Sequence, residues 1–139
     1  MGKRIAVLII CSLLIVSAAL ALTACKGDAG SMPNTVKEFT SSKQTSGGTT
    51  VVNYQTIVKA DANWDKMSSK DRQKIIDYAF NQAKQQASDN GVTSYNVMGK
   101  GEATDSQTSP ILFMYDKDNN QVIIYVDGEV SDRVAPPGE

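Results

Sequence analysis

Two short apolar runs near the end of the chain place the strongest constraint on its fold. Nearly continuous apolar and β-branched side chains occur in residues 110–115 (PILFMY) and 121–126 (QVIIYV). This pattern is typical of strands whose apolar side chains must be shielded from water. Between them, residues 116–120 (DKDNN) are rich in the Asp and Asn that favour tight turns. We therefore predict a hairpin that is apolar on both of its faces.

A helix is predicted over residues 69–89. Ser68 followed by Asp71 is close to a capping box, and Asn90-Gly91 supplies a stop signal. Apolar residues recur at spacings of three and four, which places them on one narrow face. They are Ile75, Ile76, Ala79, Phe80, Ala83 and Ala87.

Two further strands complete the predicted domain. Residues 51–59 (VVNYQTIVK) are rich in β-branched residues, and residues 93–99 (TSYNVMG) alternate weakly. The order is therefore strand, helix, strand, strand, strand. This order predicts an α+β fold over residues 51–130, with one helix packed on a mostly antiparallel four-stranded sheet. Residues 131–139 (SDRVAPPGE) contain two prolines and are predicted to form a flexible tail.

The N-terminus has the order of an export signal. Lys3 and Arg4 precede an apolar run over residues 5–22, and small residues follow. That run is also long enough for a membrane-spanning helix. Leu22-Thr23-Ala24-Cys25, at the end of the run, resembles the lipobox of bacterial lipoproteins. An uncleaved signal anchor and an ordinary signal peptide remain the alternatives.

The resemblance implies cleavage between Ala24 and Cys25, with residues 1–24 as the signal peptide. It also implies a diacylglycerol on the Cys25 thiol, with palmitate and N-acylation as the expected lipid chemistry. The chain would then be anchored on the extracytoplasmic face of the cell membrane. The Ser/Thr/Gly-rich segment 25–50, predicted to be a flexible stalk, favours a Gram-positive cell. In a Gram-negative cell, Lys26 after the cysteine implies the outer membrane.

Composition argues against several functional classes. The chain has no His, and its only cysteines, Cys11 and Cys25, precede the predicted domain. This removes the commonest general base and metal ligand, and any disulfide within the domain. The formal charge is −1 and no basic stripe is present, so nucleic-acid binding is not expected. We predict a protein that is not an enzyme, with no cofactor apart from the covalent lipid and no metal.

An interaction surface is the leading candidate site. One helix covers only one face of a sheet, yet the predicted hairpin directs Ile111, Phe113 and Tyr115 to one face and Leu112 and Met114 to the other. Aromatic residues fall along the strands and before the helix, and we take Tyr54, Tyr95, Tyr115, Tyr125 and Trp64 as candidate members of that surface. It would serve self-association into a homodimer or binding of an envelope protein. The alternatives are that the tyrosines and the tail cover the second face, and that Trp64 is a buried lid.

Two polar segments have competing interpretations. Residues 116–120 begin like a calcium-binding loop, but Gln121 and Asp127 stand where Gly and Glu are usual, so a hairpin turn is favoured. Residues 99–109 lack the spacing of a phosphate-binding loop and are predicted to be a solvated connection.

The sequence thus indicates a non-enzymatic binding or accessory module in the cell envelope. Residues 69–130 are also loosely similar to PepSY domains, ending in IIYVDGEV. That resemblance implies, as an alternative, a regulator or inhibitor of an extracytoplasmic enzyme such as a peptidase. A small hydrolase is the third alternative.

Overall fold

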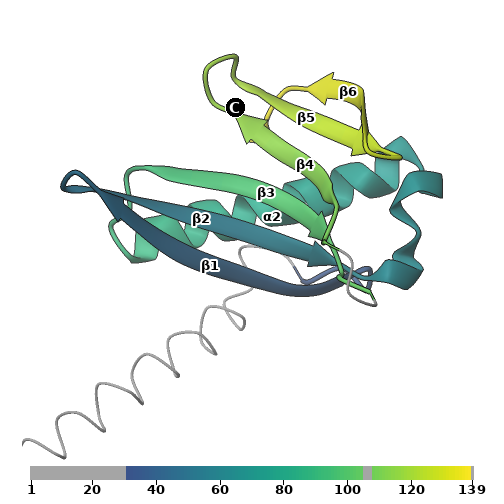
Figure 1. The fold of residues 1–139 in the computed structure, drawn as a ribbon, viewed down its shortest axis with the longest axis horizontal. Helices are drawn as coiled ribbons and strands as arrows, with labels where there is room; N and C mark the ends of the chain where they lie inside the picture. The colour runs from purple at the N-terminus through teal and green to yellow at the C-terminus, as the bar shows by residue number, and fades with distance from the viewer. Residues whose placement is uncertain (1–30, 105–107, 139) are drawn as a thin grey trace, which may run out of the picture.

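The computed structural model describes residues 31–104 and 108–138, which form one helix packed on one face of a mixed sheet (Figure 1). The predicted signal peptide and Cys25 lie outside the described residues. The elements are β1 (Val36–Ser46), β2 (Thr49–Val58), the short 3₁₀ turns η2 (Ala60–Ala62) and η3 (Trp64–Lys66), α2 (Ser69–Asp89), β3 (Tyr95–Gly101), β4 (Ile111–Asp116), β5 (Gln121–Val126) and β6 (Glu129–Val134).

The sheet differs in detail from the predicted one. In the described part of the chain it has six strands in the order β1-β2-β3-β4-β5-β6. The pair β2–β3 is parallel, joined by the crossover through α2, and the other pairs are antiparallel. The α+β class and the single main helix are confirmed, whereas the prediction of four strands was wrong.

The two additional strands lie where a stalk and a tail were expected. Strand β1 occupies much of segment 25–50, and β6 extends into segment 131–139. Each forms a hairpin through a two-residue turn with positive φ, at Gly47-Gly48 (57° and 80°) and at Asp127-Gly128 (52° and 78°). Such turns match the twist of the strands they join. Beyond β6, Pro136 is buried.

Helix α2 has the predicted bounds because its signals are local. The Ser68 hydroxyl accepts a hydrogen bond from the Asp71 N–H (3.1 Å) and donates one to the Asp71 carboxylate (2.9 Å). At the other end, Gly91 has a φ of 64°.

The core lies between α2 and the sheet. Its buried apolar residues are Val36, Val52, Tyr54, Val58, Trp64, Ile75, Ile76, Tyr78, Ala79, Ala83, Ala87, Val97, Leu112, Phe113, Val122 and Ile124. Gly99 is required here because a Cβ at this position would overlap the Phe113 ring. The opposite face of the sheet, which we call the open face, has no helix over it within the described residues (Figure 1).

Candidate interaction surface

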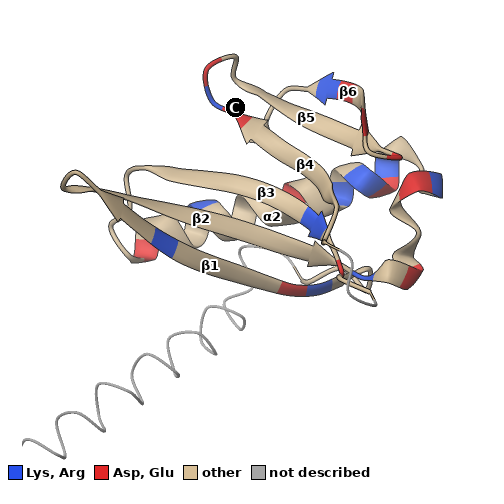
Figure 2. Ribbon diagram, viewed as in Figure 1, with Lys and Arg blue, Asp and Glu red and all other residues tan. Residues whose placement is uncertain are grey.

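The open face carries one row of side chains that crosses every strand of the described sheet. The strand registers align Thr40, Gln55, Met98, Met114, Ile123 and Arg133, in that order from β1 to β6. Met98, Met114 and Ile123 are apolar and partly exposed, and the residues at both ends of the row are polar. Strands β2 and β5 contain no charged residue, as Figure 2 shows.

Further apolar side chains widen this row into a patch. Tyr125 lies on the same face of β5 as Ile123, and its hydroxyl is 3.4 Å from the Met114 sulfur. Val130 pairs with Tyr125 and is 48% exposed, and Ile111 on β4 is 42% exposed. We call this group the open-face patch: Met98, Ile111, Met114, Ile123, Tyr125 and Val130.

A β-bulge in β4 alters the predicted alternation of side chains. Gly99 pairs with Phe113 and Lys100 with Ile111, so that Leu112 is the extra residue. Leu112 is 6% exposed and lies in the core with Phe113, whereas Ile111 is displaced outward. The prediction that Ile111 and Phe113 share a face, opposite Leu112, was therefore wrong. Strict alternation is a good guide only while the ladder stays regular.

The five predicted aromatic residues do not form one surface. Tyr54, Tyr95, Tyr115 and Trp64 lie on the side covered by the helix, and Tyr125 lies on the open face. Tyr54 and Trp64 are only 2% and 5% exposed, so these two rings provide almost no surface for a partner. Tyr54 contacts Tyr95 edge to face at 5.6 Å between ring centroids.

Trp64 instead closes one end of the core, as the lid interpretation expected. Its ring stacks on Phe113 at 5.9 Å, and its indole N–H donates to the Tyr125 carbonyl at 2.7 Å. The Arg72 guanidinium lies 5.6 Å from the centre of the Trp64 ring and donates hydrogen bonds to the Trp64 carbonyl. The Asp65 carboxylate accepts from the Asp127 N–H at 2.9 Å. These hydrogen bonds attach the connection between β2 and α2 to the β5–β6 hairpin.

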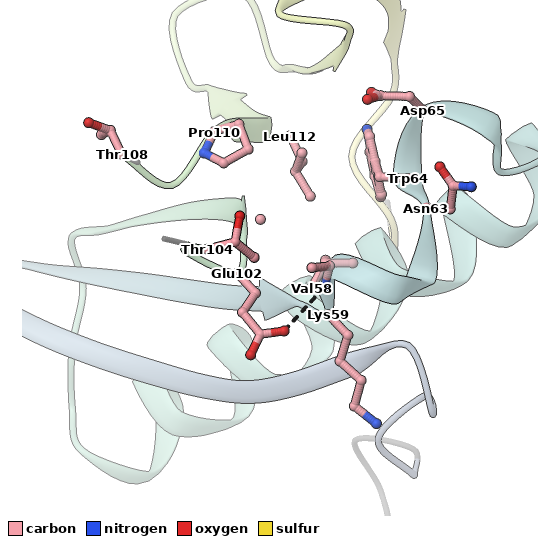
Figure 3. Close-up of a pocket in the computed structure, with 12 residues that line it drawn as sticks. Val58, Lys59, Asn63, Trp64, Asp65, Glu102, Thr104, Thr108, Pro110 and Leu112 are labelled. Atoms are coloured by element: carbon pink, nitrogen blue, oxygen red, sulfur yellow. Dashed lines mark hydrogen bonds between the residues drawn. The ribbon is translucent and has the colours of Figure 1, made fainter. Parts of the chain in front are cut away.

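A small pocket lies beside this lid, at the carboxyl ends of β2 and β3 (Figure 3). Its volume is about 240 Å³, below the range of about 300–1,000 Å³ that is usual for small-molecule sites. Leu112 and Pro110 project into it, while the Lys59 amine points away. No sequence signal indicated this pocket, because its walls come from four separate segments.

The acidic groups of the pocket have partners within the protein. The Glu102 carboxylate is 2.6 Å from the Lys37 amine and accepts the Ala60 N–H at 3.2 Å. These contacts lower the pKa of Glu102, and the hydrogen bond with Glu102 raises the pKa of Lys37. The pair ties the start of β1 to the ends of β2 and β3, so we interpret it as structural. Among the described residues, no group of three or more Cys, Asp or Glu side chains is placed to hold a metal ion.

The segment 116–120 forms the predicted hairpin turn. The Asp116 carboxylate accepts from the Asn119 amide group at 2.8 Å and from Gln121 at 3.3 Å. These hydrogen bonds, that of Asn119 above all, lower the pKa of Asp116. The turn is thus held by its own side chains.

Comparison with known proteins gave no relatives. No family model, curated protein or solved structure matched the chain. Within residues 31–104 and 108–138, no helix combines the length and the apolar character needed to cross a membrane.

Proposed function

We propose that this protein is a lipoprotein anchored to the extracytoplasmic face of a membrane, where it acts as a non-enzymatic binding module for an envelope protein. The observation that carries the proposal is the open-face patch. Its apolar row crosses the centre of the sheet, has polar ends and is not covered by any described element. Apolar centres with polar rims are typical of protein interfaces.

The anchor is supported by the sequence Leu22-Thr23-Ala24-Cys25. Because β1 begins at Val36, the tether from Cys25 to the domain is shorter than the stalk that the sequence suggested. Eleven residue steps separate Cys25 from Val36, which corresponds to roughly 40 Å at full extension. The module would therefore work close to the membrane surface. Removal of Lys3 and Arg4 with the signal leaves 12 basic and 15 acidic side chains, so attachment would depend on the lipid rather than on charge.

The patch can be tested by site-specific photo-crosslinking in intact cells. A photoreactive residue at Ile123 samples the centre of the patch. The matched control is the same residue at Lys74, whose side chain is 62% exposed on α2, on the opposite side of the sheet. We expect a discrete crosslinked protein from position 123 and none from position 74. The absence of an adduct at 123 from correctly anchored protein, or equal adducts from both sites, would contradict the proposal.

The identity of the captured protein then defines the role. A peptidase would indicate regulation of an enzyme, and a transporter or a wall-assembly component would indicate an accessory role. Met114→Lys should reduce capture roughly tenfold or more, because a charge at the centre of an apolar interface costs more than about 1.4 kcal/mol. Its melting temperature should stay close to that of the wild type, because Met114 is outside the core.

A further inference from the structure

The two edges of the described sheet differ in how they are protected. Strand β6 is short, contains a bulge at Ser131 and includes the charged residues Glu129, Asp132 and Arg133. Short length, bulges and charges are the means by which proteins prevent edge strands from pairing with other chains. The β6 edge is therefore a poor template for further pairing.

The β1 edge lacks these protections over most of its length. Strand β1 has eleven residues, and its one irregularity is at Lys37, near its start. From Phe39 to Ser46 (FTSSKQTS) the register is regular, the only charge is Lys43 and there is no proline. Apart from Phe39, which is partly buried, every side chain in this stretch is exposed. An exposed edge of this kind is prone to pair with another strand.

The hairpin geometry shows which backbone groups face outward. Because Gly47-Gly48 is a two-residue turn, Ser46 and Thr49 form its closing hydrogen-bonded pair. In an antiparallel ladder every second residue bonds to the same neighbour, so residues 40, 42, 44 and 46 bond to β2. The alternation along β2 agrees with this assignment, because the Val52 N–H points away from β1 and donates to the Ser94 carbonyl. The N–H and C=O groups of Phe39, Ser41, Lys43 and Thr45 therefore point away from the sheet.

We infer that two copies of this chain pair through their β1 strands, antiparallel and about a twofold axis at Ser42, to form one continuous sheet. In this register Phe39 lies opposite Thr45 of the second copy, and Ser41 lies opposite Lys43 of the second copy. All four outward residues of each copy are then paired. The two Lys43 side chains are diagonal neighbours and not directly opposite, which reduces the repulsion between them.

The assembly closes at two copies. Pairing consumes both β1 edges, and the edges that remain are the two protected β6 strands. A twofold contact between identical strands is self-complementary and leaves no site for a third copy. This inference is independent of the proposed lipid anchor and of the open-face patch, which stays exposed in the dimer.

Disulfide trapping in cells tests the pairing on the full chain. The register places Ser42 opposite Ser42 of the second copy, at a non-hydrogen-bonded position where side chains approach closely. Ser42→Cys should give a disulfide-linked dimer on a non-reducing gel after mild oxidation. The matched control is Ser131→Cys, at the bulge of the protected edge, which should stay monomeric. Equal dimer yields from the two variants would overturn the inference.

The unmodified chain provides a separate control for the anchor. Cys11 should be lost with the signal and Cys25 should be acylated, so the wild type should give no disulfide dimer. A dimer from the wild type would indicate free Cys11 or Cys25, which is a failure of the anchor and not of the pairing.

A proline variant tests the same contact without a cysteine. Ser41→Pro removes an outward N–H while leaving the bonds from β1 to β2 in place. Added to Ser42→Cys, it should abolish the disulfide dimer.

If the proline lowers the melting temperature strongly, amide hydrogen exchange on the wild type tests the pairing instead. Pairing predicts that the Ser41 and Lys43 amides exchange as slowly as those of Ser42 and Gln44. Fast exchange confined to residues 41 and 43 would overturn the inference.

Discussion

At the scale of single residues, Thr56 is out of place in its surroundings. It lies on β2, between β1 and β3, and its side chain is fully buried in the core. Its hydroxyl has no hydrogen-bond partner among the described residues. A buried hydroxyl without a partner costs free energy that an apolar group of the same shape would not.

Thr56→Val should therefore stabilise the protein. The free energy of unfolding should rise by about 1 kcal/mol, measured by urea denaturation of the wild type and the variant. Val52→Thr, which places a hydroxyl at a buried position of the same strand, is the matched control and should destabilise. A loss of stability in Thr56→Val would show that the hydroxyl has a bonding role.

Three tyrosines make stability depend on pH in the alkaline range. Burial raises the pKa of Tyr54, Tyr78 and Tyr95 above the usual value of about 10. Because the folded-state pKa exceeds the unfolded-state pKa, the neutral rings favour folding at pH values below about 10. That contribution is lost as pH rises through the folded-state pKa.

We expect the melting temperature to fall as the pH is raised above about 10. Phenolate absorbance should show a component that titrates at a higher pH than free tyrosine. This component should become smaller in Tyr54→Phe. Titration of all five tyrosines together near pH 10 would contradict the buried placement.

At the scale of elements, α2 depends on its N-terminal cap. Ser68→Ala removes the acceptor for the Asp71 N–H and should lower the free energy of unfolding by about 1 kcal/mol. This corresponds to several degrees in melting temperature for a domain of this size. Ser69→Ala, at the first helical residue, is the control and should have little effect. Equal losses in both variants would show that the cap is not the cause.

The helix and four strands, β2 to β5, were predictable because their signals are local. The cap at Ser68, the apolar spacing along α2 and the turn at 116–120 each lie within a few residues. Strand β1 was missed because its side chains are mostly exposed and show no apolar alternation. The available signal was Gly47-Gly48 between Ser/Thr-rich segments, and Asp127-Gly128 was the equivalent signal for β6.

The candidate surface was only partly predictable. That a second apolar face would exist follows from a single helix and the apolar hairpin. Its members depend on strand register, on the bulge at Leu112 and on the parallel pairing of β2 with β3. None of these is fixed by neighbouring residues in the sequence, so tyrosines on the side covered by the helix were included and Met98 was not.

At the scale of the whole molecule, the outer strands β1 and β6 complete the described sheet. Phe39 of β1 stacks on Tyr54 at 5.8 Å and contacts Tyr78 of α2 edge to face at 6.2 Å. Deletion of residues 26–46 should therefore expose the edge of β2 and part of the core. We expect this shortened chain to aggregate or to lose its cooperative thermal transition in circular dichroism. Normal cooperative melting would show that β1 is dispensable.

The proposed location of the protein depends on whether Cys25 is modified with lipid. The most direct measurement is intact-mass spectrometry, with N-terminal fragmentation, of full-length protein extracted from cell membranes with detergent. If Cys25 is the lipid anchor, the chain begins at residue 25 and carries a diacylglycerol on that residue. A chain that begins at Met1, or an unmodified cysteine at position 25, would contradict it.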